Sequence, residues 1–210
     1  MPPNDCRIRL ALESDAEAIA AIYRPIVETT AISFETVPPT AEGVARRVSD
    51  TTTTHPWLVC ERAGHVAGYA YASPHRTRAA YRWSVDTSVY VAQQHQRAGV
   101  GRGLYVSLFA ILVAKGYCNA YAGIALPNPA SVALHESVGF TSIGVYRHVG
   151  FKHGAWHDVG WWQLTLRERE SSPAEPIGLA IVRGRTDWDS LVARGERHIR
   201  ASAPEAHGIK

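Results

Sequence analysis

The spacing of hydrophobic and polar residues along this chain alternates between two periods, and each period predicts a kind of element. Apolar residues at every second position, or in short runs bounded by turn residues, are typical of strands. Such segments occur at residues 7–12, 57–61, 66–71, 82–91, 121–126, 140–151 and 159–166. The second and third segments are joined by a turn containing Gly64, which predicts a hairpin.

Apolar residues three and four positions apart predict helices between these strands. A capping box at residues 14–17 opens the first helix, and Pro25 is expected to kink or end it. Further helices are expected at residues 40–48, capped by Thr40, at 104–115 and at 128–138. The helix at 104–115 is apolar on more than one side, so we expect it to be buried.

The order of these elements mixes hairpins with strand–helix–strand crossovers, which predicts the fold class. A mixed, twisted central sheet flanked by helices is expected, in the α+β class. This domain is expected to span residues 1–167. A charged, proline-bearing linker follows it. Residues 168–210 are therefore predicted to be a C-terminal extension, a linker with room for a short helix, which is partly disordered or docks on the domain.

Composition narrows the class of protein without identifying it. The 210 residues carry a net charge of +3, so nothing demands a nucleic-acid partner, although a mildly basic chain suits an anionic cofactor. Three widely spaced cysteines argue against a disulfide framework and favour a cytoplasmic location. No signal peptide or membrane span is recognised, and the ten histidines are scattered, so no metal site is expected.

The candidate chemistry begins at residues 96–103, Gln-Arg-Ala-Gly-Val-Gly-Arg-Gly, between a predicted strand and the long apolar helix. Glycines at every second position let the backbone turn tightly and approach a ligand. A helix that begins there points free amides and its positive dipole end at the same place, which predicts a diphosphate site. Neither the P-loop nor the Rossmann pattern fits this spacing.

The stretch from Gln96 to Gly101 resembles the acetyl-CoA loop of the GNAT acetyltransferases. Residues 128–140, Asn-Pro-Ala-Ser-Val-Ala-Leu-His-Glu-Ser-Val-Gly-Phe, resemble a second segment of that family. The Trp-rich run at 152–163, together with residues 81–91, looks like the phosphinothricin N-acetyltransferase branch. The resemblance covers roughly residues 7–166 and leaves the tail outside it.

This resemblance implies a GNAT-like acyl-CoA N-acyltransferase fold and an activity. Acetyl would pass from acetyl-CoA to the α-amino group of a small amino-acid-like acceptor, such as phosphinothricin, methionine sulfoximine or methionine sulfone, by direct attack of the amine. Herbicide resistance and a homodimer are implied as well. Neither a membrane nor a nucleic acid is expected as a partner.

The resemblance also implies roles for individual residues. Asp86 stands where the branch has a glutamate and is expected to act as the base, with a bridging water more favoured because aspartate is shorter. His135 is expected to protonate the leaving thiolate. Acetyl-CoA is expected to bind Val89, Tyr90, Val91, Arg97, Ala98, Gly99, Val100, Gly101, Arg102, Gly103, Asn128 and Ser137. The acceptor is expected to meet Phe34, Tyr81 and Arg82.

Two other functions stay open at this point. A GNAT enzyme could act on another small amine, such as an aminoglycoside or a polyamine, but the basic loop at residues 73–81 argues against a polycationic acceptor. The chain could also be an acyl-CoA-binding module without turnover, since Asp86 departs from the usual glutamate and His135 from the tyrosine of many relatives.

Overall fold

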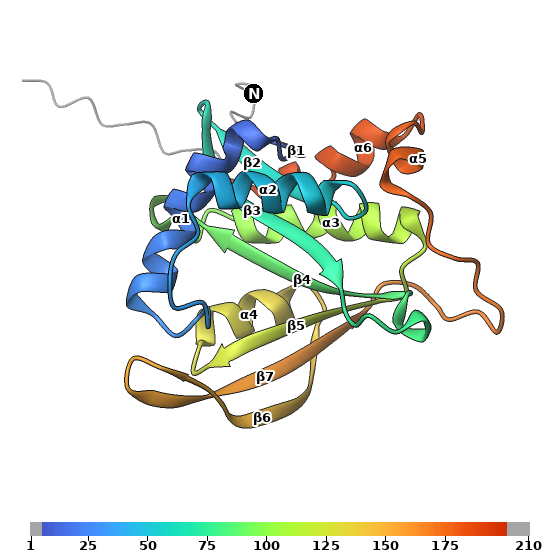
Figure 1. The fold of residues 1–210 in the computed structure, drawn as a ribbon. Helices are drawn as coiled ribbons and strands as arrows, with labels where there is room; N and C mark the ends of the chain where they lie inside the picture. The colour runs from blue at the N-terminus through green and yellow to red at the C-terminus, as the bar shows by residue number, and fades with distance from the viewer. Residues whose placement is uncertain (1–5, 201–210) are drawn as a thin grey trace, which may run out of the picture.

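The computed structural model describes residues 6–200, which form one seven-stranded sheet with helices on both faces (Figure 1). The strands are β1 (Cys6–Leu10), β2 (Trp57–Arg62), β3 (His65–Pro74), β4 (Ser84–Val91), β5 (Asn119–Leu126), β6 (Thr141–Lys152) and β7 (Ala155–Thr165). The helices are α1 (Ala16–Thr29), α2 (Ala41–Thr52), α3 (Val100–Lys115), α4 (Pro129–Ser137), α5 (Leu179–Arg183) and α6 (Trp188–Ala193).

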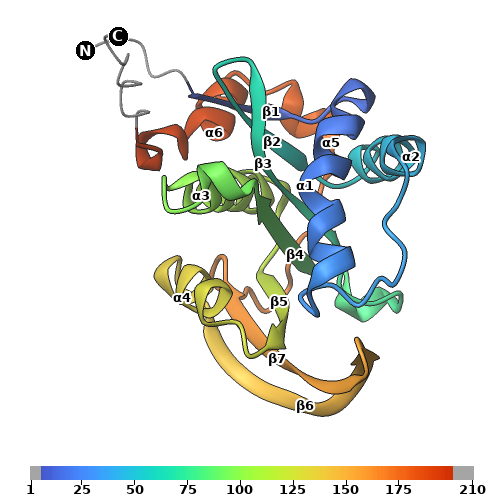
Figure 2. The ribbon, with the colours of Figure 1, turned by 90° about the vertical axis from the view of Figure 1, so that its left-hand side faces the viewer.

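The sheet is mixed, as the order of the predicted elements requires. Its strand order is β1-β2-β3-β4-β5-β7-β6, and the β4–β5 pair is parallel while the other neighbours are antiparallel. Helices α1 and α2 lie on one face and α3 and α4 on the other (Figure 2). The predicted fold class is therefore confirmed.

Several local signals act as the sequence predicts. The Thr40 hydroxyl accepts a hydrogen bond from the Gly43 amide at 3.1 Å and caps α2. Ala63 and Gly64 both have positive φ, which suits the two-residue hairpin turn between β2 and β3. Gly116 ends α3 with a φ of 98°.

The predicted start of the first helix is wrong, and one of the two outcomes expected at Pro25 does not occur. The capping box at 14–17 does not form, because α1 follows a short 3₁₀ turn in which the Asp15 carboxylate accepts the Leu12 amide at 2.8 Å. Pro25 does not end α1, which continues to Thr29. Tyr23 and Val27 are buried on either side of the proline, and their packing keeps the helix intact through it.

The parallel pair in the centre of the sheet separates part-way along its length. β4 and β5 are in register only where Ser84–Asp86 face Asn119–Tyr121, although β4 continues to Val91 and β5 to Leu126. Beyond Asp86 the two strands diverge (Figure 1). This divergence opens the sheet at its centre, between α3 and α4.

The core lies mainly around α3, whose apolar residues on more than one side are buried, as the sequence predicts. Leu104, Leu108 and Ile111 are fully inaccessible to solvent. The extension supplies one wall of this core, since Leu179, Val192 and Ile199 are buried in the same cluster. Within residues 6–200, no helix has both the length and the hydropathy to cross a bilayer.

Candidate active site

The separation of β4 from β5 forms a slot whose walls carry several of the predicted residues. Backbone groups of successive strand residues point to alternate sides, and β4 beyond Asp86 is paired only with β3. Part of its backbone therefore faces the slot without a β5 partner in register. The slot is lined by Ile32, Thr87, Ser88, Val89, Tyr90, Tyr105, Gly123, Ile124, Ala125, Asn128, Ser131 and His135.

The glycine-rich loop forms the start of α3 at one end of β4. Gly99 is the residue before the helix and has a φ of 86°, which glycine adopts without strain. Its carbonyl accepts the Gly103 amide at 2.9 Å, the first bond of the helix. The amides of Val100, Gly101 and Arg102 thus belong to the unpaired first turn. These amides and two exposed cationic side chains, Arg97 and Arg102, fit a diphosphate.

The loop glycines have a second role that the sequence did not reveal. Gly103 faces the extension: a Cβ there would lie 2.9 Å from the carbonyl oxygen of Gly195. A Cβ on Gly195 would overlap the Gly103 backbone in turn. One turn further along, the Ser107 hydroxyl donates to the Val192 carbonyl at 2.6 Å and accepts the Gly195 amide at 3.0 Å.

The same extension reaches the beginning of the loop. A Cβ on Gly99 would overlap the carbonyl of His198, and the Arg200 amide donates to the Ala98 carbonyl at 2.9 Å. Gly101 points the other way, toward Leu134 of α4. Alternate glycines therefore serve two sides of the helix: Gly99 and Gly103 let the extension approach, and Gly101 lets Leu134 of α4 approach.

Helix α4 presents its first turn to the slot. Asn128 caps it by accepting the Ser131 amide through Oδ1 at 3.1 Å, which leaves the side-chain NH₂ group to donate. Ser137, predicted to contact the cofactor, lies at the opposite end of α4 and is not among the slot-lining residues. Its hydroxyl donates to the Leu134 carbonyl at 2.7 Å, so the helix itself uses it.

His135 lies in the slot wall with both ring nitrogens engaged. Nδ1 is 2.7 Å from the Ser131 carbonyl oxygen, which can only accept, so Nδ1 carries the proton. Nε2 then accepts from the Tyr105 hydroxyl at 2.8 Å. Burial lowers the pKa of His135, which favours the neutral ring. No local pattern marks Tyr105 as a polar site residue, because its partner His135 lies 30 residues away in sequence.

Asp86 occupies the last paired position before β4 and β5 diverge. Its Oδ1 atom is 2.7 Å from Nδ1 of His75. Burial raises the pKa of the Asp86 carboxyl, and the His75 hydrogen bond and the Arg76 charge oppose that rise. Nothing in the local sequence around His75 distinguishes it from the other residues of the basic loop.

His75 borders a second cavity, which has no lining residue in common with the slot. Its ring stacks on Tyr121 with centroids 4.3 Å apart, and the Arg76 guanidinium lies over the Trp161 ring at 5.8 Å. The Trp161 indole N–H is buried without a hydrogen-bond partner. The cavity holds about 230 Å³ and is lined by His75, Arg76, Tyr121, Ile143, Gly144, Tyr146 and Trp161.

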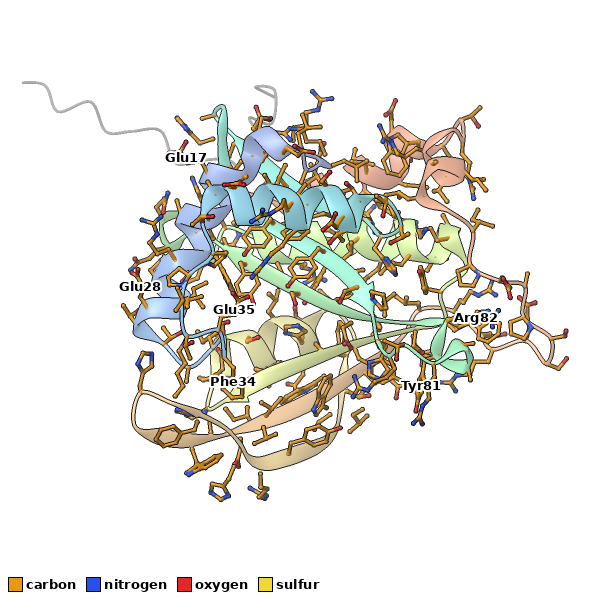
Figure 3. The ribbon with its side chains drawn as sticks, viewed as in Figure 1. Glu17, Glu28, Phe34, Glu35, Tyr81 and Arg82 are labelled. Atoms are coloured by element: carbon orange, nitrogen blue, oxygen red, sulfur yellow. The ribbon has the colours of Figure 1, made fainter. Side chains whose placement is uncertain are left out.

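The predicted acceptor residues do not come together in one chain. Tyr81 lies near the cavity, with its ring 5.9 Å from that of His75. Arg82 instead pairs with Glu175 of the linker, so its charge is already matched. Phe34 lies against Gly150 of β6, toward the opposite end of the β4–β5 pair (Figure 3). Within a single chain, Phe34 and Tyr81 therefore have different neighbours, Gly150 and His75.

Among residues 6–200, no group of three or more potential metal ligands comes together. The polar groups of the site are instead backbone amides, an asparagine amide, imidazoles and a carboxylate. Such donors suit an organic phosphate ligand and proton transfer.

Comparison with known proteins gives consistent results. A family model described as an acetyltransferase (GNAT) domain matches residues 8–161. A phosphinothricin N-acetyltransferase from Streptomyces viridochromogenes is 44% identical over 156 residues, covering 74% of this chain and 85% of that protein. An L-methionine sulfoximine/L-methionine sulfone acetyltransferase from Salmonella typhimurium is 36% identical over 168 residues, covering 80% of this chain and 98% of that protein.

A solved structure extends the likeness to the fold. It is a GNAT superfamily phosphinothricin acetyltransferase from Sinorhizobium meliloti in complex with AcCoA. The two chains superpose with a TM-score of 0.77 at 35% identity, covering 81% of this chain and 94% of that one. The family model ends within β7, so the C-terminal extension, which begins at residue 168, lies outside its span.

Proposed function

Because the chain belongs to the GNAT acetyltransferase family, we propose that it acetylates the α-amino group of a small amino acid of the phosphinothricin or methionine sulfoximine type. The chain is an N-acetyltransferase, and its acetyl donor is acetyl-CoA. One observation carries the proposal about the acceptor. Asp86 is hydrogen-bonded to His75, which lines a cavity together with Arg76, and it directly precedes Thr87, which lines the slot.

The slot and loop are proposed to bind the donor. The first-turn amides from Val100 to Arg102 would hold the diphosphate, with the Arg97 side chain nearby. The β4 backbone at residues 89–91 and the Asn128 amide would hold the pantetheine arm, since both offer uncommitted hydrogen-bonding groups. An unpaired β4 amide would also stabilise negative charge on the thioester carbonyl oxygen.

The Tyr105–His135 pair is proposed to serve the leaving thiolate. Nδ1 of His135 donates to the Ser131 carbonyl, and Nε2 accepts a hydrogen bond from the Tyr105 hydroxyl. His135 therefore acts on the proton of the Tyr105 hydroxyl. We therefore assign His135 to orienting that hydroxyl, which is the protic group of the pair within reach of the slot.

The cavity beside His75 is proposed to bind the acceptor. An amino acid brings a carboxylate, and a phosphinate or sulfoximine brings a second strong hydrogen-bond acceptor. Arg76 supplies a cation and Trp161 an unused N–H, with Tyr81 at the cavity edge. A polyamine would meet the same cation unfavourably, which argues against the small-amine alternative.

We also propose a homodimer and a cytoplasmic location. Strands β6 and β7 expose large apolar side chains next to the unpaired edge of the sheet. Exposed apolar side chains at an open edge are typical of a surface that a second chain covers. These are Ile143, Val145, Tyr146, Val149, Phe151 and Trp156. The described cysteines are thiols rather than disulfides, which suits a reducing compartment. Acetylation of phosphinothricin would make the protein a herbicide-resistance determinant.

The test is a screen of acceptors with acetyl-CoA, read as release of free thiol. Phosphinothricin, methionine sulfoximine and methionine sulfone are expected to be acetylated, and spermidine and an aminoglycoside are not. Turnover of the amines alone would establish the small-amine function instead. Binding of acetyl-CoA without turnover of any acceptor would establish a binding module.

A further inference from the structure

Because of the contact between His75 and Asp86, the ring of His75, and not the Asp86 carboxylate, borders the cavity proposed for the acceptor. His75 borders the cavity, whereas Asp86 is not among its lining residues. Oδ1 of Asp86 is already committed to His75 at 2.7 Å. The imidazole therefore stands between the carboxylate and the space where an acceptor amine would lie.

The hydrogen bond also determines the form of the ring. An ionised carboxylate only accepts, so Nδ1 of His75 carries the proton that it donates to Asp86. In the neutral ring the lone pair is then on Nε2. No hydrogen bond to Nε2 of His75 is found among the described residues, so this atom is available to a ligand.

Three aromatic rings hold His75 in this orientation. Its ring is parallel to Tyr121 within 19°, and the Tyr81 and Trp161 rings contact it edge-on at 5.9 and 6.3 Å. The side chain is 13% exposed, so it has little freedom to turn away from Asp86. A base oriented by a carboxylate through its other nitrogen is the arrangement that activates nucleophiles in many enzymes.

We propose that His75, through Nε2, is the general base of the acetyl transfer, and that Asp86 orients it and stabilises its charged form. This inference rests on the proposed function of the site. The acceptor ammonium gives one proton to Nε2, and its freed lone pair forms the C–N bond to the thioester carbon. The C–S bond then breaks, the nitrogen loses a second proton, and the sulfur leaves as a thiol. His75 returns its proton to water.

The test combines two substitutions with chemical rescue in the full-length chain. His75→Ala is expected to lower kcat/KM by about 10²- to 10⁴-fold, the usual contribution of a general base. Added imidazole is expected to restore part of that activity by occupying the vacated space. His75→Gln retains a hydrogen-bond donor for Asp86 but has no basic nitrogen, so it is expected to be as slow as His75→Ala.

The controls separate this inference from the function it rests on. His65→Ala changes an exposed histidine at the start of β3 and is expected to leave the rate unchanged and insensitive to imidazole. Acetyl-CoA affinity, measured by calorimetry, is expected to be unchanged in all three variants. Failure of the unaltered protein to bind acetyl-CoA or turn over any acceptor would refute the proposed function itself.

Two results would overturn the role of His75 while leaving the acetyltransferase intact. Near-normal turnover by His75→Gln would show that the residue only positions Asp86. A slow His75→Ala variant that imidazole does not restore, with an acceptor KM raised in proportion, would show that His75 binds the acceptor rather than taking its proton.

Discussion

At the scale of single residues, the site depends on side chains whose polar atoms are paired with a specific neighbour. His135 is limited to one proton arrangement by Ser131 and Tyr105, and Asp86 is tied to His75. Each pair places a titratable group beside either the slot or the cavity. The chemistry therefore depends on how these groups are oriented as much as on which residues are present.

Replacing the carboxylate tests that orientation directly. Asp86→Asn keeps the size of the side chain but removes its charge, and its amide can donate to Nδ1 and favour the wrong imidazole tautomer. We expect kcat/KM to fall by about 10²- to 10⁴-fold. Acetyl-CoA affinity, measured by calorimetry, is expected to stay within about twofold, because the diphosphate loop is remote from this change. A variant with near-normal turnover would remove Asp86 from the mechanism.

At the scale of elements, one ion pair joins the edge strand β1 to the start of α1. The Arg9 guanidinium donates to both oxygens of Asp15, at 2.7 and 2.8 Å, and the Leu12 amide donates to the same carboxylate. Burial alone would raise the pKa of Asp15, but the hydrogen bonds from Arg9 and Leu12 outweigh it and lower that pKa. The turn before α1 is thus held by charge where the predicted capping box is absent.

The lowered pKa predicts how stability depends on pH. The ionised Asp15 carboxylate contributes its full stabilisation at pH values above the ordinary pKa of an aspartate. This contribution is lost as the pH falls through the lower pKa that Asp15 has in the folded state. Asp15→Asn is expected to lower the free energy of unfolding by about 1–3 kcal/mol at pH 7. It is also expected to make this free energy fall less steeply as the pH is lowered. Urea unfolding from pH 7 to pH 2 measures both effects.

Glu42→Gln is the control for this prediction. Glu42 forms an exposed pair with Arg46 on α2, so its loss is expected to change stability by less than about 0.5 kcal/mol. An Asp15→Asn variant whose stability falls with acid as steeply as that of the unaltered protein would contradict the assignment.

At the scale of the whole molecule, the extension and the acetyl-CoA loop form one unit. Residues 177–200 follow α3 along its length, from Lys115, which donates to the Ile177 carbonyl, to Ala98, which accepts the Arg200 amide. The Gly103–Gly195 contact lets the two backbones approach without side chains between them. The side of the loop opposite the slot is therefore supported by residues beyond the family model.

This support makes a distant glycine important for cofactor affinity. Gly195→Ala would force the extension away from Gly103, and we expect the Kd for acetyl-CoA to rise roughly tenfold or more, because small misplacements of binding groups are costly. Gly178→Ala is the matched control, since a Cβ there meets nothing within 4 Å. Calorimetry with acetyl-CoA checks both. A less stable Gly195→Ala variant with unchanged Kd would show that the extension supports the fold but not the loop.

The exposed apolar side chains of β6 and β7 predict the oligomeric state. Phe151→Asp and Trp156→Asp, made together, place charges on side chains that are 59% and 61% exposed in one chain. They are expected to convert a dimer into a monomer in sedimentation experiments. Ile181→Asp, an equally exposed apolar position on α5, is expected to leave the dimer unchanged. A monomeric unaltered protein would contradict the proposed dimer.

Much of the fold and part of the site could be predicted from the sequence, because their signals are local. The alternation of strand residues, the Thr40 cap and the Gly64 turn depend on neighbours a few positions away. The glycine loop is equally local, since it needs only a strand, three glycines and a helix in succession. Ser137 shows the limit, because only the structure reveals that its hydroxyl donates to the Leu134 carbonyl of its own helix.

The sequence by itself determined the mixed sheet, the family and the glycine-rich turn before α3, since backbone propensity and short motifs act within a few residues of the chain. Only the tertiary structure decided what surrounds them: His75 beside Asp86, Tyr105 beside His135, and the extension against α3. Ser107 and Val192, for example, are 85 residues apart in sequence and in hydrogen-bond contact in space. Such contacts depend on the packing of whole elements, which no local pattern encodes.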